Sequence, residues 1–177
     1  LPNPVPGARI REACRGFFSR SEAVRFLAPG RVLRARVRGE RDFRLEVGVD
    51  QPERILYAQS TILASGRFLA RGLQGERDGI REPLFDLPVA QPDTREAWHS
   101  RNLFDPRGHG LDSAGIETDD RFRPVNAAGQ VVCQGLFAAG SILAHADWMR
   151  FKCGAGLCLA SAWRAAESAA HWVGRTE

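Results

Sequence analysis

The chain has 177 residues, 44% of them hydrophobic and 26% charged, with a formal net charge of +4. This length suffices for one well-buried domain, and the composition is typical of a soluble globular protein. No apolar run approaches the roughly 20 residues needed to span a bilayer, and no basic-then-apolar leader opens the chain. Composition therefore argues against transmembrane and signal-bearing classes.

The positive charge comes almost wholly from arginine, because Lys152 is the only lysine. The arginines are scattered rather than clustered, which weakens a nucleic-acid interpretation. A general bias of arginine over lysine is the simpler explanation. Binding of an anionic ligand or of nucleic acid by these arginines stays open as a weaker alternative.

Four cysteines stand at positions 14, 133, 153 and 158, without a C-x-x-C pair or a histidine at zinc-site spacing. We therefore predict no metal site and expect reduced, mostly buried thiols of a cytosolic protein. Cys153 precedes a predicted helix, where a thiolate would be stabilised, although packing is the simpler role.

The first residues predict an extended start followed by a helix. Prolines at positions 2, 4 and 6 favour extended backbone. Residues 7–18 then carry apolar side chains at helical spacing, which predicts an amphipathic helix with its arginines outside. Residues 23–27 are a short strand candidate.

The next segment alternates in polarity and predicts an antiparallel sheet. Residues 32–38 and 43–49 form two half-apolar runs around a turn at 39–41, the pattern of a β-hairpin. Residues 55–58 and 60–64 are expected to continue the sheet. The last of these is nearly all apolar, so we expect both of its faces to be buried.

The middle of the chain has little periodicity. Residues 66–91 hold several glycines and prolines and predict an irregular loop with short strand pieces; such a long irregular stretch in a compact domain is usually functional. Its charged residues fit either a solvated loop with local ion pairs or a structural or substrate-side role. Further on, residues 111–114 predict a helical turn and residues 126–129 a hairpin loop.

The most informative stretch is near the C-terminus. Residues 136–139 are a short apolar run that ends at Gly140, which predicts a buried strand and a tight turn. Residues 154–173 predict a helix that opens on Gly154-Ala155-Gly156. A helix N-terminus presents free N–H groups, which suit an anion or an electron-rich ring.

The same stretch has a simpler interpretation. The glycines could serve only turns and close packing, and the helix carries a stripe of small side chains that would lie against a sheet. From the residues alone the two interpretations stay open. The stripe comprises Cys158, Ala162, Ala165, Ala166 and Ala169.

The order of several motifs resembles a known family. The segment GLFAAGS followed by GAGLCLASAWRAAE is similar to the C-terminal flavin-contacting part of two-dinucleotide-binding flavoproteins. The segments TILASGRF (61–68) and GLQGERDGIREPLF (72–85) resemble the B subunit of anaerobic glycerol-3-phosphate dehydrogenases. The opening VPGxR (5–9) and RPVNxxGQ (123–130) match it too, so the resemblance covers nearly the whole chain.

This resemblance implies an α+β fold, a fragment of an α/β flavoprotein. We expect an opening segment with a helix (1–20), a β-rich substrate-side region with an antiparallel or mixed sheet (21–130), and the returning strand and last helix of the flavin domain (131–177). The chain starts at Leu1 and contains no G-x-G-x-x-G, the motif that cradles a dinucleotide pyrophosphate. We therefore expect a C-terminal fragment.

The resemblance also implies a cofactor and its contacts. The cofactor would be FMN or FAD, and we expect it to be absent from the isolated fragment. The implied cofactor-binding residues are Gly140, Ser141, Gly154, Ala155 and Gly156. Two departures from the family stand here: Ser141 replaces an acidic residue, and Ala144-His145 replaces Gly-Gly.

The implied function is that of a flavin-dependent oxidoreductase subunit passing electrons from glycerol-3-phosphate oxidation towards the quinone pool. Its partners would be substrate-oxidising and iron–sulfur subunits, with no nucleic acid and only peripheral membrane association through those partners, in the cytoplasm. No catalytic residue is assigned, because lone histidines such as His99 and His145 are more often structural. The alternative is a non-catalytic module that docks other subunits.

Overall fold

The computed structural model describes residues 5–27 and 30–174, and within them the strands form three small, separate sheets. This mixture of helices with antiparallel and parallel pairing confirms the predicted α+β class. The strands are β1 (Arg31–Arg38), β2 (Asp42–Gly48), β3 (Pro52–Ala58), β4 (Thr61–Leu63), β5 (Gln74–Gly75), β6 (Ile80–Arg81) and β7 (Leu136–Ala138).

Short helical turns and two long helices make up the remaining regular structure. The long helices are α1 (Val5–Phe18) and α4 (Gly154–Gly174). The short ones are η1 (Arg95–Trp98), α2 (Gly110–Ser113), η2 (Gly140–Ile142) and α3 (Trp148–Phe151). No helix among residues 5–27 and 30–174 is long and apolar enough to cross a bilayer.

The first sheet is an antiparallel meander in the order β1-β2-β3. Register pairs such as Ala35 with Leu45 and Leu45 with Leu56 confirm the predicted hairpin and its third strand. Alternation puts Phe43 and Val47 of β2 in the core. Glu46 is also buried, and its carboxylate is paired with the Arg44 guanidinium on the same strand.

Two strand predictions near this sheet are wrong. Residues 23–27 form turns and irregular backbone rather than a strand. Strand β4 does not extend the meander; it pairs in parallel with β7, more than seventy residues later in the chain. Only Leu63 of β4 is buried, whereas Ile62 is 38% exposed, so the two faces of this strand are not both covered as expected.

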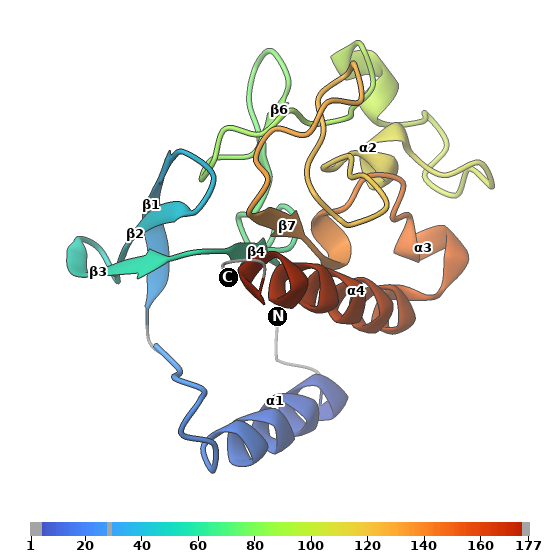
Figure 1. The fold of residues 1–177 in the computed structure, drawn as a ribbon. Helices are drawn as coiled ribbons and strands as arrows, with labels where there is room; N and C mark the ends of the chain where they lie inside the picture. Colours follow the sequence, from blue (N-terminus) through green and yellow to red (C-terminus); the bar gives the residue numbers. More distant parts are fainter. Residues whose placement is uncertain (1–4, 28–29, 175–177) are drawn as a thin grey trace.

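Helix α1 forms as predicted, but its apolar stripe does not pack. Ile10 is 65% exposed and Phe17 is 71% exposed. Figure 1 shows α1 lying apart from the body of the chain. Helical periodicity therefore identified the element correctly, while the burial expected of its apolar face is absent.

The irregular middle, residues 66–91, is ordered by buried side chains. Glu82 is 0% exposed, and its carboxylate accepts hydrogen bonds from the amides of Leu84 (2.8 Å), Phe85 (2.8 Å) and Leu87 (3.4 Å). The Gln91 side chain holds both the amide and the carbonyl of Ile80, at 2.6 and 3.0 Å. Surface ion pairs exist too, yet these buried bonds define the loop.

The long C-terminal helix has the extent predicted from the sequence, but the residues that form its buried face differ from the predicted stripe. Figure 1 shows α4 lying along the β4–β7 pair. Ala165 is buried against Phe137 and Ala139, as the stripe predicted. Cys158, Ala162 and Ala166 are exposed, and Ser161 replaces them in the contact face.

Ser161 fastens α4 to the end of β7. Its buried hydroxyl accepts a hydrogen bond from the Gly140 amide (2.9 Å) and donates to the Leu157 carbonyl (2.6 Å). When the O–H of a helical serine donates to a carbonyl of the preceding turn, its oxygen lone pairs can still accept a hydrogen bond from outside the helix. The side chain thus joins the helix to the turn that follows the strand.

Replacing Glu82 tests the loop. Glu82→Gln keeps the side-chain shape but leaves at least one of three amides facing an NH2 group, so we expect a loss of about 1.5–3 kcal/mol in unfolding free energy. Urea denaturation followed by circular dichroism measures it. Glu96→Gln, at an exposed position, is the matched control and should change stability by less than about 0.5 kcal/mol. Equal effects of the two variants would contradict the assignment.

Replacing Ser161 tests the helix attachment. Ser161→Ala leaves the Gly140 amide without its partner, which should cost about 1–3 kcal/mol. Ser168→Ala makes the same change on the same helix at a half-buried position and should be neutral or stabilising by up to about 0.5 kcal/mol through helix propensity. If both variants were equally stable in urea, Ser161 would not be the fastening residue.

Candidate functional site

The candidate site is built at the carboxyl edge of the β4–β7 pair. Because the strands run parallel, with Leu63 opposite Ala138, the turns that follow them leave the sheet at the same edge. Each turn uses a glycine in the left-handed region, Gly66 (φ 71°) and Gly140 (φ 81°). In open α/β sheets, ligands bind outside the carboxyl ends of the strands.

The two turns contact each other and the last helix. A Cβ added at Gly66 would lie 3.7 Å from the Ser141 hydroxyl. A Cβ at Gly140 would lie 3.7 Å from the Cys158 sulfur of α4. Together with the Ser161 hydrogen bond to Gly140, these contacts bring both glycine turns together and place Gly140 against Cys158 and Ser161 of α4.

The first turn of α4 presents small side chains and free amides. Gly154 lies beside Trp148, whose Cβ is 3.4 Å from the position of an added Cβ. Ala155 is exposed, and a Cβ at Gly156 would meet nothing within 4 Å. Helix geometry leaves the first amides without intrahelical acceptors, and the structure supplies no other backbone acceptor for Gly154, Ala155 and Gly156 among the described residues.

The five residues predicted from sequence therefore fall into two groups. Gly140 and Ser141 lie together at the sheet edge, and Gly154, Ala155 and Gly156 form the start of the helix that packs on that edge. None of the five lines the cavities of about 690, 330 and 550 Å³ among the described residues. The two groups are linked through α4, whose Cys158 and Ser161 contact Gly140.

Sequence reasoning missed two residues of this region. Gly66 belongs to the TILASGRF motif without being assigned to a site, although an apolar strand followed by Ala64-Ser65-Gly66 repeats the pattern around Gly140. Ser161 had no visible signal, because a serine within a stripe of alanines looks like one more small packing residue.

The segment that leads into α4 is held under backbone strain. His145 (φ 60°) and Lys152 (φ 55°) adopt the left-handed conformation that is costly for side-chain-bearing residues. The His145 ring lies 2.7 Å from the Glu117 carboxylate at an exposed position. Asp147, which is buried, caps α3 by accepting from the Arg150 amide at 2.9 Å.

A half-buried arginine next to the Gly66 turn is bonded to α2. Arg67 donates to the carbonyls of Leu111 and Asp112. Burial lowers the pKa of Arg67, and the nearby carboxylates of Asp112 and Asp147 oppose that shift. The guanidinium therefore ties the turn after β4 to α2.

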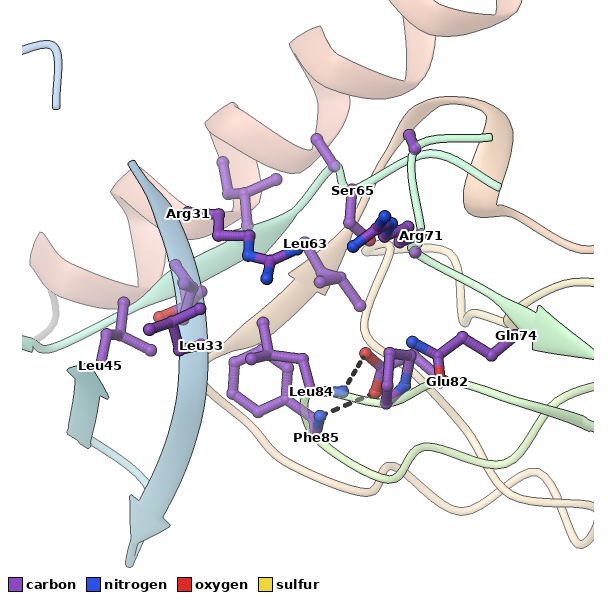
Figure 2. A pocket seen from close by; sticks show the side chains of 17 residues that line it. Arg31, Leu33, Leu45, Leu63, Ser65, Arg71, Gln74, Glu82, Leu84 and Phe85 are labelled. Atoms are coloured by element: carbon purple, nitrogen blue, oxygen red, sulfur yellow. Dashed lines mark hydrogen bonds between the residues drawn. The ribbon is translucent and has the colours of Figure 1, made fainter. Parts of the chain in front are cut away.

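A groove of about 690 Å³ is lined by β4 and the turn after it, together with residues of β1 and the segment around Glu82 (Figure 2). Figure 2 shows Arg31 of β1 and Arg71 of the following loop approaching it from opposite sides. Two hydroxyls in its lining, Thr61 Oγ1 and Ser65 Oγ, are buried without a hydrogen-bond partner among the described residues. Both oxygens are inaccessible to solvent and so do not face the open space of the groove, which leaves Arg31 and Arg71 as the lining groups suited to an anion.

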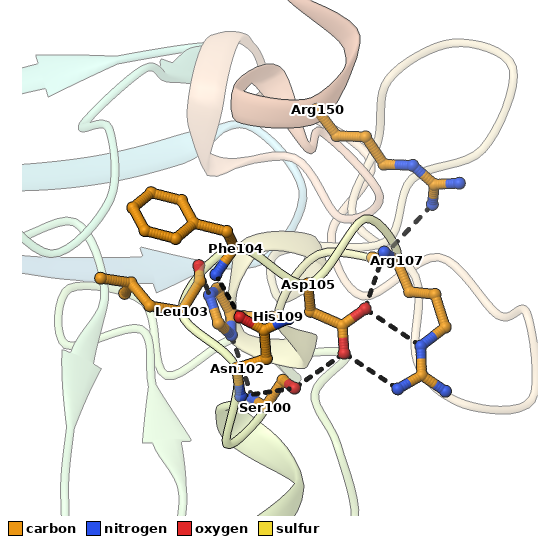
Figure 3. Close-up of polar contacts among 8 residues, drawn as sticks. All are labelled: Ser100, Asn102, Leu103, Phe104, Asp105, Arg107, His109 and Arg150. Atoms are coloured by element: carbon orange, nitrogen blue, oxygen red, sulfur yellow. Dashed lines mark hydrogen bonds and ion pairs between the residues drawn. The ribbon is translucent and has the colours of Figure 1, made fainter.

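A second polar cluster is self-contained (Figure 3). The Arg107 guanidinium donates to both Asp105 carboxylate oxygens and, with the Ser100 hydroxyl, holds the pKa of that carboxyl well below its ordinary value. His109 accepts from the Ser100 amide through Nδ1 (3.0 Å), and its other ring nitrogen lies 3.2 Å from the Leu103 carbonyl. Each group is satisfied within the loop, so its role is structural.

The cysteines differ from expectation. Three of them, Cys14, Cys153 and Cys158, are exposed rather than buried. Cys133 is half-buried, and burial raises the pKa of its thiol. Within the described part of the chain, no group of three or more histidine, cysteine, aspartate or glutamate side chains is placed to hold a metal ion.

Comparison with known proteins identifies relatives that share these segments. The chain is 34% identical over 163 residues to the B subunit of the anaerobic glycerol-3-phosphate dehydrogenase of Yersinia pestis bv. Antiqua (strain Antiqua), covering 92% of this chain and 37% of the relative. It is 35% identical over 113 residues to the same-named protein of Aliivibrio fischeri (strain MJ11), covering 64% of this chain and 24% of the relative. The resemblance expected from the motifs is confirmed.

The match extends beyond bacteria. The probable B subunit of the anaerobic glycerol-3-phosphate dehydrogenase of Halobacterium salinarum (strain ATCC 29341 / DSM 671 / R1) is 32% identical over 116 residues, covering 66% of this chain and 27% of the relative. The chain thus spans 24% to 37% of the length of these curated relatives. No solved structure matches it significantly.

A family model described as the FAD binding domain matches residues 3–157, which include β4, β7, both glycine turns and the start of α4. The chain therefore belongs to the FAD-binding-domain family.

Proposed function

We propose that this chain supplies the flavin-contacting edge of a flavin-dependent oxidoreductase. The observation that carries the proposal is the meeting of two left-handed glycine turns, packed against Cys158 and Ser161 of α4, in a member of the FAD-binding-domain family. Strand ends, glycines without a Cβ and free helix amides are the elements that let a dinucleotide approach the backbone closely.

The residues present fit a flavin. Small side chains leave the start of α4 open, with nothing within 4 Å of a Cβ added at Gly156. When bound, the flavin would supply the redox chemistry, while the protein binds, orients and tunes it. The family favours FAD, and FMN is the alternative.

Each part of the edge then has a role. Gly140, whose amide is engaged by Ser161, provides space rather than a hydrogen bond. Ser141 offers a hydroxyl, without the charge that an acidic residue would bring. Gly154, Ala155 and Gly156 present amides and the positive end of the helix dipole, which stabilise negative charge by about 0.3–1 kcal/mol, and by up to about 2 kcal/mol when partly buried.

The wider function follows from the names of the relatives. We infer a protein similar to the B subunit of anaerobic glycerol-3-phosphate dehydrogenase, passing electrons from glycerol-3-phosphate oxidation towards the quinone pool. It would work beside substrate-oxidising and iron–sulfur subunits, in the cytoplasm or at the membrane through those partners. The division into residues 1–20, 21–130 and 131–177 stays part of this proposal.

A docking module without chemistry is the second candidate. The observation that favours it is a set of large apolar side chains left uncovered. Leu159 and Trp163 of α4 are exposed, as are Ile10 and Phe17 of α1 and Phe104. In that case the glycines would serve packing alone, and flavin binding would not depend on the start of α4.

Valine at Gly156 separates the two candidates. Because no atom lies within 4 Å of a Cβ there, Gly156→Val should leave the fold intact while filling the space assigned to the flavin. We expect FAD affinity to fall at least about tenfold, or about 1.4 kcal/mol. Flavin absorbance and fluorescence titration of the flavin-binding protein measure it, beside the melting temperature of its flavin-free form.

Gly16→Val is the matched control, since Gly16 lies in α1 with nothing within 4 Å of an added Cβ. It should leave flavin affinity unchanged and shift the melting temperature as little as Gly156→Val does. Unchanged FAD affinity in Gly156→Val would remove the start of α4 from the site and favour the docking module. Loss of fold together with flavin would favour packing as the role of Gly156.

A further inference from the structure

A separate cavity of about 330 Å³ lies between the second half of α4 and the turn at residues 119–123. Its floor is apolar, formed by Phe137 of β7 and Trp172 of α4. Its polar lining includes Arg121, Arg123, Gln134, Arg164, Ser168 and His171. None of the residues assigned to the flavin edge takes part, so the cavity is a distinct feature of the chain.

The turn that carries two of the arginines is rigidly held. The Asp119 carboxylate accepts from the amides of Arg121 (3.0 Å) and Arg123 (2.9 Å) and from the Arg123 side chain (Nε, 2.8 Å). Phe122 adopts a left-handed φ of 64°, and its carbonyl accepts from the Ala138 amide at 2.8 Å. A strained turn anchored to a core strand positions its side chains before any ligand arrives.

The positive and negative side chains of the cavity lining do not cancel. Burial raises the pKa of Asp119, but the hydrogen bonds from Arg123 and Arg121 outweigh it, so the net pKa is lowered and the carboxylate stays ionised against Arg123. Arg164 is paired with Glu167 at 3.3 Å. Arg121 has no ion pair with any described residue, which leaves one uncompensated guanidinium at the cavity.

The lining of the cavity also offers more hydrogen-bond donors than acceptors. The Gln134 side-chain oxygen accepts from the Arg123 guanidinium, so its NH2 group is the end left free to donate. The Ser168 hydroxyl, His171 and the Arg121 guanidinium add further donors, whereas Glu167 is the one acidic side chain in the lining. A lining rich in donors and poor in acceptors fits a ligand rich in acceptors.

We propose that this cavity binds the phosphate or carboxylate group of a small organic anion, independently of the flavin. Arg121 would provide the charge, with Gln134 and Ser168 donating beside it. Phe137 and Trp172 would cover the apolar body of the ligand. A volume of about 330 Å³ is at the lower end of the range for small-molecule sites, about 300–1,000 Å³, so a compact metabolite fits and a dinucleotide does not.

Titration with inorganic phosphate and with malonate tests the proposal, with sodium chloride as the ionic-strength control. Nuclear magnetic resonance of arginine Nε–H and tryptophan indole groups reports on Arg121 and Trp172 directly. We expect saturable shifts there with at least one of the two probes and none with chloride. A response to phosphate assigns phosphate esters, and a response to malonate assigns carboxylates.

Two variants from different elements locate the site. Arg121→Gln on the turn and His171→Gln on α4 should each weaken the responding probe at least about fivefold, or about 1 kcal/mol. Arg36→Gln, an equal change at an exposed position on β1, should leave its affinity unchanged. Arg121 and His171 are both exposed, so neither variant is expected to unfold the chain, and circular dichroism checks this.

Three results would overturn the proposal. The first is the absence of saturable shifts with both probes. The second is equal weakening by Arg36→Gln and Arg121→Gln, which would indicate general electrostatic attraction. The third is a response confined to residues outside the cavity. None of these results bears on the flavin edge, whose test uses a different ligand and different residues.

Discussion

The parallel pairing of β4 with β7 is the constraint on which the rest of this chain depends. It joins two three-residue strands, Thr61–Leu63 and Leu136–Ala138. The Thr61 amide donates to the Gly135 carbonyl and the Ala139 amide to the Leu63 carbonyl, each at 3.0 Å. The Ser60 hydroxyl adds a third bond to Gly135. Parallel strands need a long crossover between them, and here that crossover contains all of the irregular middle of the chain.

Buried polar groups give this irregular middle its shape. Little of it is regular strand or helix, so its backbone amides need other partners to be buried without cost. Within the crossover, the buried Glu82 and the half-buried Asp119 accept from amides of the following residues and thereby fix turns, and the buried Asp147 does the same beyond β7. Because each carboxylate receives more than one hydrogen bond or a cap position, burial of these groups costs less than their charge alone would suggest.

Sequence predicted what is set locally. Alternation in residues 32–49 indicated the hairpin, the apolar run before Gly140 indicated β7, and the glycine-led alanine run indicated α4. The partner of β4 could not be found this way, because pairing across more than seventy residues leaves no periodic trace. The contact face of α4 was misassigned for a related reason: many of its side chains are small, so size does not mark the buried ones, and Ser161 is identified only by its bond to Gly140.

In the candidate site, too, the local features could be predicted from the sequence and the long-range contacts could not. Glycines that need a positive φ are visible in sequence, and both Gly66 and Gly140 stand after apolar runs. Whether two such turns meet depends on strand pairing, and whether a helix N-terminus reaches them depends on packing. The exposed stripe of α1 makes the complementary point, since Ile10 and Phe17 are spaced for burial yet lie in solvent; periodicity specifies a face, not the surface that covers it.

The two ends of α4 show why the proposed sites use different chemistry. At its start the helix itself provides free amides and a partial positive charge, so an anionic or electron-rich ligand needs little more than space and small side chains. The C-terminal end of the helix carries the negative pole of the same dipole, which disfavours an anion. An anion pocket placed there must obtain its positive charge from side chains, and that is where Arg121, Arg123 and Arg164 are gathered. The proposed flavin edge can therefore rely on backbone groups, whereas the proposed anion cavity depends on the side chain of Arg121, since Arg123 and Arg164 are paired with Asp119 and Glu167.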